Sequence, residues 1–188
     1  MDGADGLDRA LPALRRGRLF LLRAFGEDCM IGPDEIAFSE NPHWGPKALL
    51  VSLYALHAMP APLVTEPFQA FKDLPGSMPY HSAFSANSER VLAPRVDEIE
   101  RWRDDIVKAF GGKKDPPGAS GDFSFLLYPM PKVGLCYIFY LADEEFPPSV
   151  TCLFTANALT FMPLDGLADV AEYTSREILH LLGGPKDV

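Results

Sequence analysis

The sequence predicts a single α+β domain, in which an antiparallel or mixed sheet, built mainly from C-terminal strands, is packed by about four to five helices. Three observations lead to this fold class. Apolar residues recur at helical spacing in several segments, and β-branched and aromatic residues gather in short runs after residue 122. In addition, 18 prolines fall mostly between the periodic segments. Short elements joined by stiffened turns are more typical of an α+β fold than of a helical bundle.

Length and charge narrow the class of protein. A chain of 188 residues with 47% hydrophobic content is sufficient for one core and short for two, so we expect one domain over residues 1–188. The net charge of -9 has the wrong sign for binding nucleic acid. The chain has no apolar run of about 18 residues, and its acidic start, MDGADGLDRA, differs from a secretory signal. We therefore expect a cytoplasmic protein that binds neither nucleic acid nor a membrane.

The N-terminal region is predicted to hold a short helix followed by strands. Apolar residues at helical spacing predict a helix over residues 5–16, which forms a peripheral N-terminal element within residues 1–17. The runs LFLLRAF, CMI and EIAF then predict a meander of short strands, although Leu19 to Phe25 alone fits a helix equally well.

The segment from Trp44 to Met59 carries the clearest helical pattern. Pro46 occupies a first-turn position, and Leu49, Leu53 and Leu56 form one stripe, with Leu50, Tyr54 and His57 beside it. So few polar residues interrupt this pattern that we expect burial on most sides. The prolines that follow, at positions 60, 62 and 67, predict an extended connection.

Two helices are expected between residues 80 and 110. Pro75 and Gly76 suit a turn with positive φ at the glycine, which leads into a helix over residues 80–92. A second helix, over residues 95–110, carries an apolar face and is closed by a pair of glycines. The segment 113–122 has almost no apolar side chain and predicts an exposed loop.

The C-terminal third is predicted to supply the main strands and a last helix. The strand runs are FSFLLY, VGLCYIFYLA, VTCLF and ALTFM. Both alternating sets of residues in VGLCYIFYLA are apolar or aromatic, which is typical of a central strand covered on both faces. Asp165 is expected to cap a final helix over residues 166–182, which ends at Gly183 and Gly184.

Three consecutive carboxylates, Asp143, Glu144 and Glu145, follow the predicted central strand. On an extended backbone Asp143 and Glu145 point to the same side, where two carboxylates suit a hard cation or a basic ligand. A run of charge at a strand end is equally typical of a solvated turn. Both interpretations stay open.

The histidines and cysteines give weaker signals. The four histidines, His43, His57, His81 and His180, match no metal-binding spacing, and His57 is expected to be a hydrogen-bonded core residue. His81 follows Tyr80 at a helix start, where both side chains can project into a cleft. The three cysteines are Cys29, Cys136 and Cys152; they are widely spaced and odd in number, which favours free, buried thiols. The chain contains no GxSxG, P-loop, GxGxxG or CxxC motif.

Several segments together resemble a known family. They are KALLVSLYALHA, FKDLPGSMPYHSAF, the helix ending in FGG, PMPKVGLCYIFYLADEEFPPSVTCLF and ALTFMPLDGLADV. Over most of residues 19–182 the chain is similar to the prokaryotic family called Domain of Unknown Function 3786. This resemblance implies an anaerobic prokaryotic source and a role near redox or one-carbon cofactor metabolism, without naming a cofactor or an activity. Thr155 and the pair Asp165-Gly166 stand where the family pattern is more acidic.

These observations leave three hypotheses for function. The leading one is a non-catalytic accessory or ligand-binding domain, with a cleft between residues 71–84 and 143–146 that binds a small polar or cationic ligand through Asp143, Glu145, His81 and Tyr80. The second is a metal-dependent enzyme, in which Asp143 and Glu145 hold a cation and His81 moves a proton. The third is a structural module that binds a protein partner.

Overall fold

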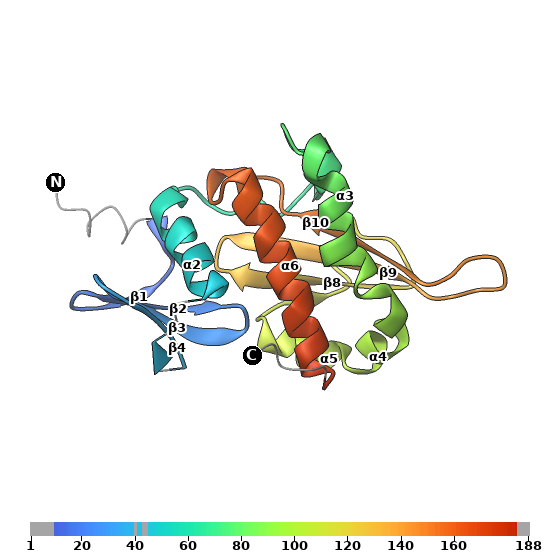
Figure 1. Ribbon diagram of the computed structural model, residues 1–188, viewed down its shortest axis with the longest axis horizontal. Coiled ribbons are helices and arrows are strands. Elements are labelled where there is room, and N and C mark those ends of the chain that lie inside the picture. Colours follow the sequence, from blue (N-terminus) through green and yellow to red (C-terminus); the bar gives the residue numbers. More distant parts are fainter. Residues whose placement is uncertain (1–9, 40, 43–44, 184–188) are drawn as a thin grey trace.

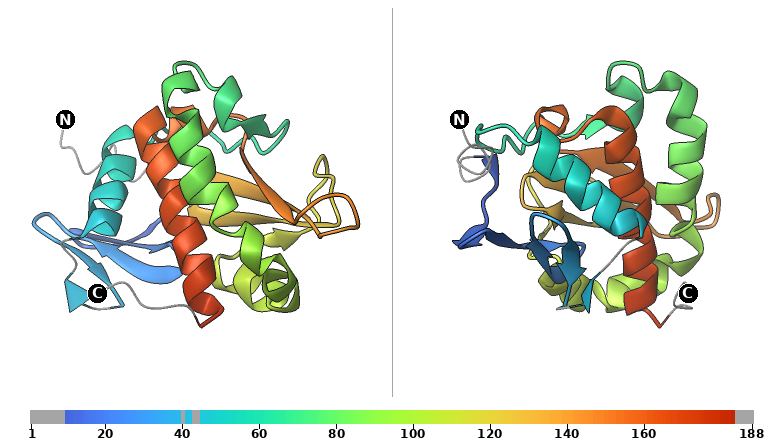
Figure 2. Two further views of the ribbon diagram at one scale, coloured as in Figure 1. Left: turned by 45° about the vertical axis from the view of Figure 1, so that its right-hand side comes forward. Right: turned by 60° about the vertical axis from the view of Figure 1, so that its left-hand side comes forward.

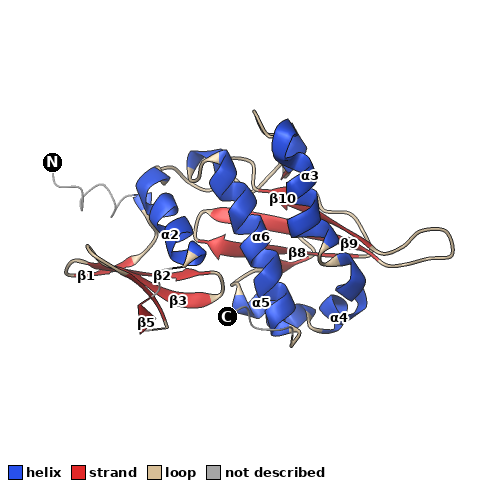
Figure 3. Ribbon diagram, viewed as in Figure 1, coloured by secondary structure: helices blue, strands red, loops and turns tan. Residues whose placement is uncertain are grey.

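The computed structural model describes residues 10–39, 41–42 and 45–183, and it has the α+β architecture that the sequence predicts (Figure 1). Its framework consists of two antiparallel five-stranded sheets, with the strand orders β1-β2-β3-β4-β5 and β6-β10-β9-β8-β7. The helices α3 and α6 lie across one face of the second sheet, while α2 lies over the first (Figures 1 and 2). Figure 3 shows the same arrangement coloured by type of element.

The first sheet confirms the predicted meander and extends it. Its strands are β1 (Leu14–Arg16), β2 (Leu19–Ala24), β3 (Glu27–Ile31), β4 (Ile36–Phe38) and β5 (Asn41–Pro42). The prediction of helix is wrong for β1, because Gly17, with φ of 63°, reverses the chain and pairs β1 with β2. Residues 5–9 of that predicted helix lie outside the described residues. Positive φ angles at Phe25 and Gly26 form the turn between β2 and β3 and rule out a helix there.

The second sheet contains the predicted central strand. Its members are β6 (Gln69–Ala70), β7 (Lys113–Lys114), β8 (Phe123–Met130), β9 (Val133–Tyr140) and β10 (Ser149–Phe154). All residues of β9 except Tyr140 are buried, and β9 lies in the middle of the sheet. The run ALTFM is not a strand as predicted but contains a short 3₁₀ turn, because the Asn157 side chain bonds to backbone groups of Pro62 and Val64 and turns the chain toward them.

The helices follow the predicted order with several interruptions. They are α2 (Pro46–His57), α3 (His81–Phe84), a π-helix (Ser85–Arg90), α4 (Val96–Arg101), α5 (Arg103–Ala109) and α6 (Leu164–Leu181). Short 3₁₀ turns cover Phe71–Asp73, Met78–Tyr80, Ala93–Arg95 and Ala158–Thr160. The predicted helix 95–110 is broken at Trp102, whose side chain is exposed. The final helix begins at Leu164 after an extended Pro163, so Asp165 is not its cap.

Helix α2 buries a different face from the predicted stripe. Its buried residues are Ala48, Leu50, Val51 and Tyr54. Leu49 and Leu56, which we expected inside, are 69% and 80% exposed, and His57 is exposed with its Nδ1 atom 2.9 Å from the Leu53 carbonyl oxygen. A helix that is apolar nearly all round does not reveal its inner face, which is set here by packing against α6 and β4.

One continuous hydrophobic core joins the two sheets and the helices. Lys47 on α2 strengthens this connection, because its Nζ atom lies 2.9 Å from Glu27 on β3 and 2.5 Å from Glu177 on α6. The three cysteines are free and buried, as expected. None of the described helices is both long and apolar enough to cross a membrane.

Candidate functional site

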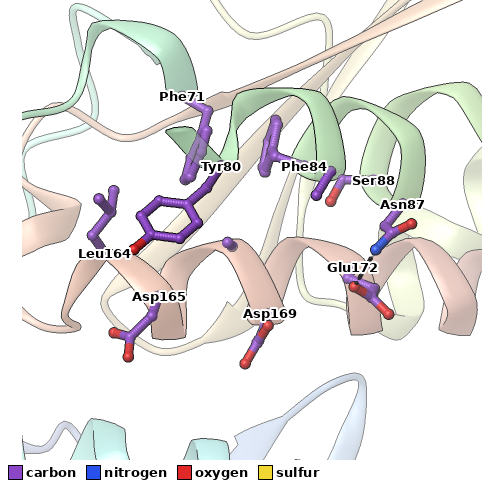
Figure 4. Close-up of a pocket in the computed structure, with 11 residues that line it drawn as sticks. Phe71, Tyr80, Phe84, Asn87, Ser88, Leu164, Asp165, Asp169 and Glu172 are labelled. Atoms are coloured by element: carbon purple, nitrogen blue, oxygen red, sulfur yellow. Dashed lines mark hydrogen bonds between the residues drawn. The ribbon is translucent and has the colours of Figure 1, made fainter. Parts of the chain in front are cut away.

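A groove of about 210 Å³ separates α3 and the π-helix from α6 (Figure 4). The chain segment on one side runs from the 3₁₀ turn at Phe71 to the π-helix, and the N-terminal half of α6 forms the other side. The groove is lined by Phe71, Tyr80, Ala83, Phe84, Asn87, Ser88, Leu164, Asp165, Ala168, Asp169 and Glu172. It therefore combines an apolar interior with a rim that carries carboxylates.

Aromatic rings form the floor of the groove. Phe71 and Phe84 stack with their ring centroids 4.2 Å apart and their planes within 7°. Phe154 of β10 lies behind both rings, at 6.1 Å from Phe71 and 5.8 Å from Phe84. The turn at Gly76 lies between Phe71 and Phe84 in the chain, and its φ of 80° confirms the predicted positive value. Contacts among buried rings give the floor a fixed shape.

Three carboxylates of α6 form the rim. Asp165, Asp169 and Glu172 are spaced by four and three residues, which places them on one face of the helix. Like charges at this spacing destabilise an isolated helix by about 0.2–0.5 kcal/mol per pair. The opposite face of α6 carries the buried residues of the core, including Leu167, Val170 and Ile178. The repulsion among the three carboxylates of the rim therefore lowers the stability of the folded protein.

The three carboxylates differ in their partners. Glu172 accepts hydrogen bonds from Arg176 at 2.6 Å and from the Asn87 side-chain amide at 2.9 Å. Asp165 accepts a bond of 2.9 Å from the Gly166 backbone N–H. Asp169 makes neither a hydrogen bond nor a salt bridge with the described part of the chain. Burial, followed by the nearby carboxylates of Glu172 and Asp165, raises the pKa of Asp169 above its usual value. Asp169 is exposed at the groove edge, and no positive partner for it lies among the described residues.

The wall opposite the carboxylates also carries an unsatisfied group. Ser88 is fully buried, and its Oγ atom has no hydrogen-bond partner among the described residues. The backbone carbonyl of Ser88 accepts a bond of 2.7 Å from the Ser175 hydroxyl on α6. Figure 4 shows the Ser88 side chain directed toward α6. Buried hydroxyls are normally bonded, and π-helices are frequent at functional sites, so the wall has two features typical of a binding site.

The structure does not bring together the four residues that the sequence predicts to bind a ligand. Tyr80 lines the groove and is 61% exposed, with its ring leaning toward Leu164 (Figure 4). Asp143 and Glu145 lie in the exposed loop 141–148 between β9 and β10, and neither lines the groove. All views show this loop extending away from the start of α3 (Figures 1 and 2). The element that faces Tyr80 is therefore α6.

Asp143 has a local role in its loop. Its Oδ1 atom accepts hydrogen bonds from the backbone N–H groups of Glu145 at 2.8 Å and Phe146 at 2.7 Å. These two bonds lower the pKa of Asp143 below its usual value. A carboxylate that closes a turn in this way defines the shape of the loop.

The described histidines lie in separate environments. His81 is half-buried, does not line the groove, and its buried Nδ1 atom has no hydrogen-bond partner among the described residues. His180 lies on α6 with Nδ1 at 3.4 Å from Glu177, whereas His43 lies outside the described residues. Within the described chain, no three His, Cys, Asp or Glu side chains gather in a way that suits a metal ion. The described residues therefore do not provide the metal site that the hypothesis of a metal-dependent enzyme requires.

The cysteines are protected from reaction by burial. Burial raises the pKa values of Cys29 and Cys136 to about 12, and it raises that of Cys152 well above its usual value. Since the thiolate is the reactive form, these side chains behave as small apolar residues near neutral pH.

Comparison with known proteins gives one match. A family model described as Domain of unknown function (DUF3786) matches residues 8–177. The chain belongs to the DUF3786 family. No curated protein and no solved structure matches it. The matched range includes every residue that lines the groove.

The sequence of this DUF3786 member predicts one side of the groove but not the other. The position of Tyr80 near a helix start predicts its place in a cleft, whereas Asp169 and Glu172 are not among the predicted site residues. A signal was present, because three acids recur at helical spacing on the polar face of the predicted C-terminal helix. Only the fold shows that this exposed face borders the groove opposite Tyr80.

Proposed function

We propose that this DUF3786 protein is a non-catalytic binding domain whose groove between α3 and α6 takes a small organic cation, such as a protonated amine with a short apolar body. The observation that carries this proposal is Asp169, a carboxylate at the edge of an apolar groove that has no partner among the described residues and lies beside Asp165 and Glu172. A ligand cation would supply the missing positive charge and relieve the repulsion among these carboxylates.

The remaining lining suits the rest of such a ligand. The ring of Tyr80 offers its face to a cation, and the Phe71 and Phe84 rings offer apolar contact to a hydrocarbon body. Ser88 belongs to the same wall, and its buried Oγ atom has no hydrogen-bond partner among the described residues. The volume of about 210 Å³ limits the ligand to a small molecule or a single side chain.

A binding role agrees with the groove's composition. Its lining consists of aromatic, aliphatic, hydroxyl, amide and carboxylate groups, without histidine, lysine or cysteine. Carboxylates of this kind can hold a cation. The family resemblance implies an accessory role near redox or one-carbon cofactor metabolism. In such a role the domain would bind its ligand without converting it chemically.

Calorimetric titration with butylamine, putrescine, agmatine and phenethylamine tests this proposal, with butyrate as the anionic control. At least one amine should bind, and Asp169→Asn should weaken it by about tenfold or more, which corresponds to the loss of a charge-assisted hydrogen bond. Ala168→Leu, which fills the groove without changing its charge, should also weaken binding. Asp97→Asn removes an exposed acid on α4 away from the groove and should have no effect.

Two results would overturn the proposal. One is the absence of binding by every amine up to about 10 mM, a weaker affinity than a specific site provides. The other is equal binding by the parent protein and by Asp169→Asn.

A further inference from the structure

The first sheet has an outer face that the groove proposal does not involve. Along β2, Phe20, Leu22 and Ala24 point into the core, so the alternate residues point outward. The cross-strand register aligns the outer residues, which are Leu14, Arg16, Leu19, Leu21, Arg23, Asp28, Met30 and Ala37. Most of them line a shallow concavity of about 900 Å³. We call this surface the outer sheet face.

The outer sheet face is basic in an otherwise acidic protein. Residues 10–24 contain no acid, although the whole chain has a net charge of -9. Arg16 and Arg23 lie on this face, whereas Arg15 lies on the opposite face of the sheet, beside Phe20. Arg23 is paired with Asp28 at 3.1 Å. Arg16 lies at the edge of the concavity, with Arg18 two residues further along in the exposed turn. An apolar centre with a basic margin is complementary to an acidic segment that carries a large apolar side chain.

The protein carries such a segment in the loop 141–148. Glu144 and Glu145 are exposed, and Phe146 is 67% exposed, which is unusual for an aromatic ring. The two backbone hydrogen bonds to Asp143 fix the turn that presents these three side chains. A loop that is already shaped loses less conformational entropy when it binds. Figures 1 and 2 show the loop projecting beyond the end of the second sheet.

The loop and the outer sheet face lie at opposite ends of the molecule, so they cannot meet within one copy (Figure 1). We propose that the loop 141–148 docks on the outer sheet face of a second copy of this chain. Phe146 contacts the apolar centre around Leu21 and Met30, while Glu144 and Glu145 pair with the basic margin. Because each copy has one loop and one face, the contact is head to tail and builds a ring or an open chain.

Salt affects this contact in two ways. Two copies with net charge -9 repel each other at long range, and at physiological ionic strength the Debye length of about 8 Å screens most of that repulsion. Charges in direct contact are screened less. We therefore expect association near 0.15 M salt and dissociation near 1 M, where the Debye length falls to about 3 Å.

Charge reversal separates this contact from other modes of association. A face variant, Arg16→Glu with Arg18→Glu, and a loop variant, Glu144→Lys with Glu145→Lys, are compared with the parent by sedimentation velocity over a range of concentrations. Each variant alone should raise the dissociation constant by about tenfold or more, because like charges then meet. A chain carrying both changes, or an equimolar mixture of the two variants, should associate again. Glu100→Lys with Arg101→Glu, at exposed positions of α4, is the matched control and should behave as the parent does.

Each contrary result overturns the proposal. If the unmodified protein stays monomeric up to about 1 mM, the loop does not dock on the outer sheet face of a second copy with a meaningful affinity. Association without recovery in the charge-swapped chain assigns the interface to another surface. A monomeric parent that binds the free peptide of residues 141–149 indicates that an acidic partner protein occupies the face instead of a second copy. Circular dichroism confirms that each variant is folded.

Discussion

The side-chain amide of Asn87 donates a hydrogen bond of 2.9 Å to Glu172, which joins the π-helix to α6 across the groove. Since Arg176 also bonds to Glu172 at 2.6 Å, the charge of Glu172 is already compensated. The unpaired negative charge of the rim is therefore concentrated at Asp169, whose pKa is raised by burial and by its acidic neighbours.

Asp169→Asn should stabilise the protein near neutral pH. The pKa of Asp169 is higher in the folded protein than its unfolded value of 3.8. Its contribution to stability is therefore most favourable below pH 3.8, where the carboxyl is protonated, and is lost as the pH rises through the folded pKa. The variant should therefore be more stable than the parent at pH 7, by about 0.5 kcal/mol for the like charges removed. Urea unfolding at pH 7 and near pH 3.5 measures the difference, which should shrink at the lower pH. A less stable variant at pH 7 would mean that Asp169 already has a favourable partner.

Lys47→Gln should destabilise the protein by about 2–3 kcal/mol. The change leaves the carboxylates of Glu27 and Glu177 together without the ammonium that lies between them. Burial lowers the pKa of Lys47, but the hydrogen bonds to Glu177 and Glu27 raise it more, so the net pKa is above the unfolded value of 10.5. The charged ammonium therefore contributes fully at pH 7, and this contribution is lost as the pH rises through the folded pKa. Chemical unfolding at pH 7 measures the loss. Lys113→Gln, at an exposed position of β7, is the control and should change stability by less than about 0.5 kcal/mol.

Gly112→Ala should destabilise the protein strongly, whereas Gly111→Asn should not. A Cβ atom at Gly112 would lie 2.2 Å from the backbone oxygen of Leu126, and backbone cannot move aside as a side chain can. Such overpacking costs about 1–3 kcal/mol or more. Gly111 has a φ of 59° with open space around it, and asparagine tolerates that conformation. Thermal unfolding compares the two variants, and equal losses would contradict the contact with β8.

The sequence predicted the fold best where a residue pattern is compatible with only one local structure. Strand β9 is apolar on both alternating sets, and a strand of this kind must lie inside a sheet. The glycines after α5 close the helix as expected, with the N–H of Gly111 bonded to Lys108 and that of Gly112 to Val107. Helix α2 shows the opposite case, because leucines occur all round it and only tertiary contacts select Leu50 over Leu49 for burial.

The candidate site was predicted only in part because it depends on pairing between distant segments. Tyr80 and Asp169 are far apart in the sequence, and neither local pattern specifies that α3 and α6 lie side by side. Consecutive charges such as Asp143 to Glu145 stand out in a sequence, but adjacent residues on a turn point to solvent. Acids spread at helical spacing are less conspicuous and converge on the groove rim.

Ser175→Ala should loosen the groove wall more than Tyr137→Phe. The Ser175 hydroxyl donates to the Ser88 carbonyl at 2.7 Å and lies 3.1 Å from the Tyr137 hydroxyl, so its removal leaves a buried carbonyl of the π-helix without this bond. We expect a loss of about 1–3 kcal/mol for an orphaned buried group. In Tyr137→Phe the bond from Ser175 to Ser88 is kept, and the loss should be about 1 kcal/mol. Urea unfolding gives both values, and hydrogen exchange of residues 85–90 locates the effect. Faster exchange there in Ser175→Ala alone is expected because this hydroxyl holds the π-helix against α6, and unchanged exchange would show that other contacts hold the wall.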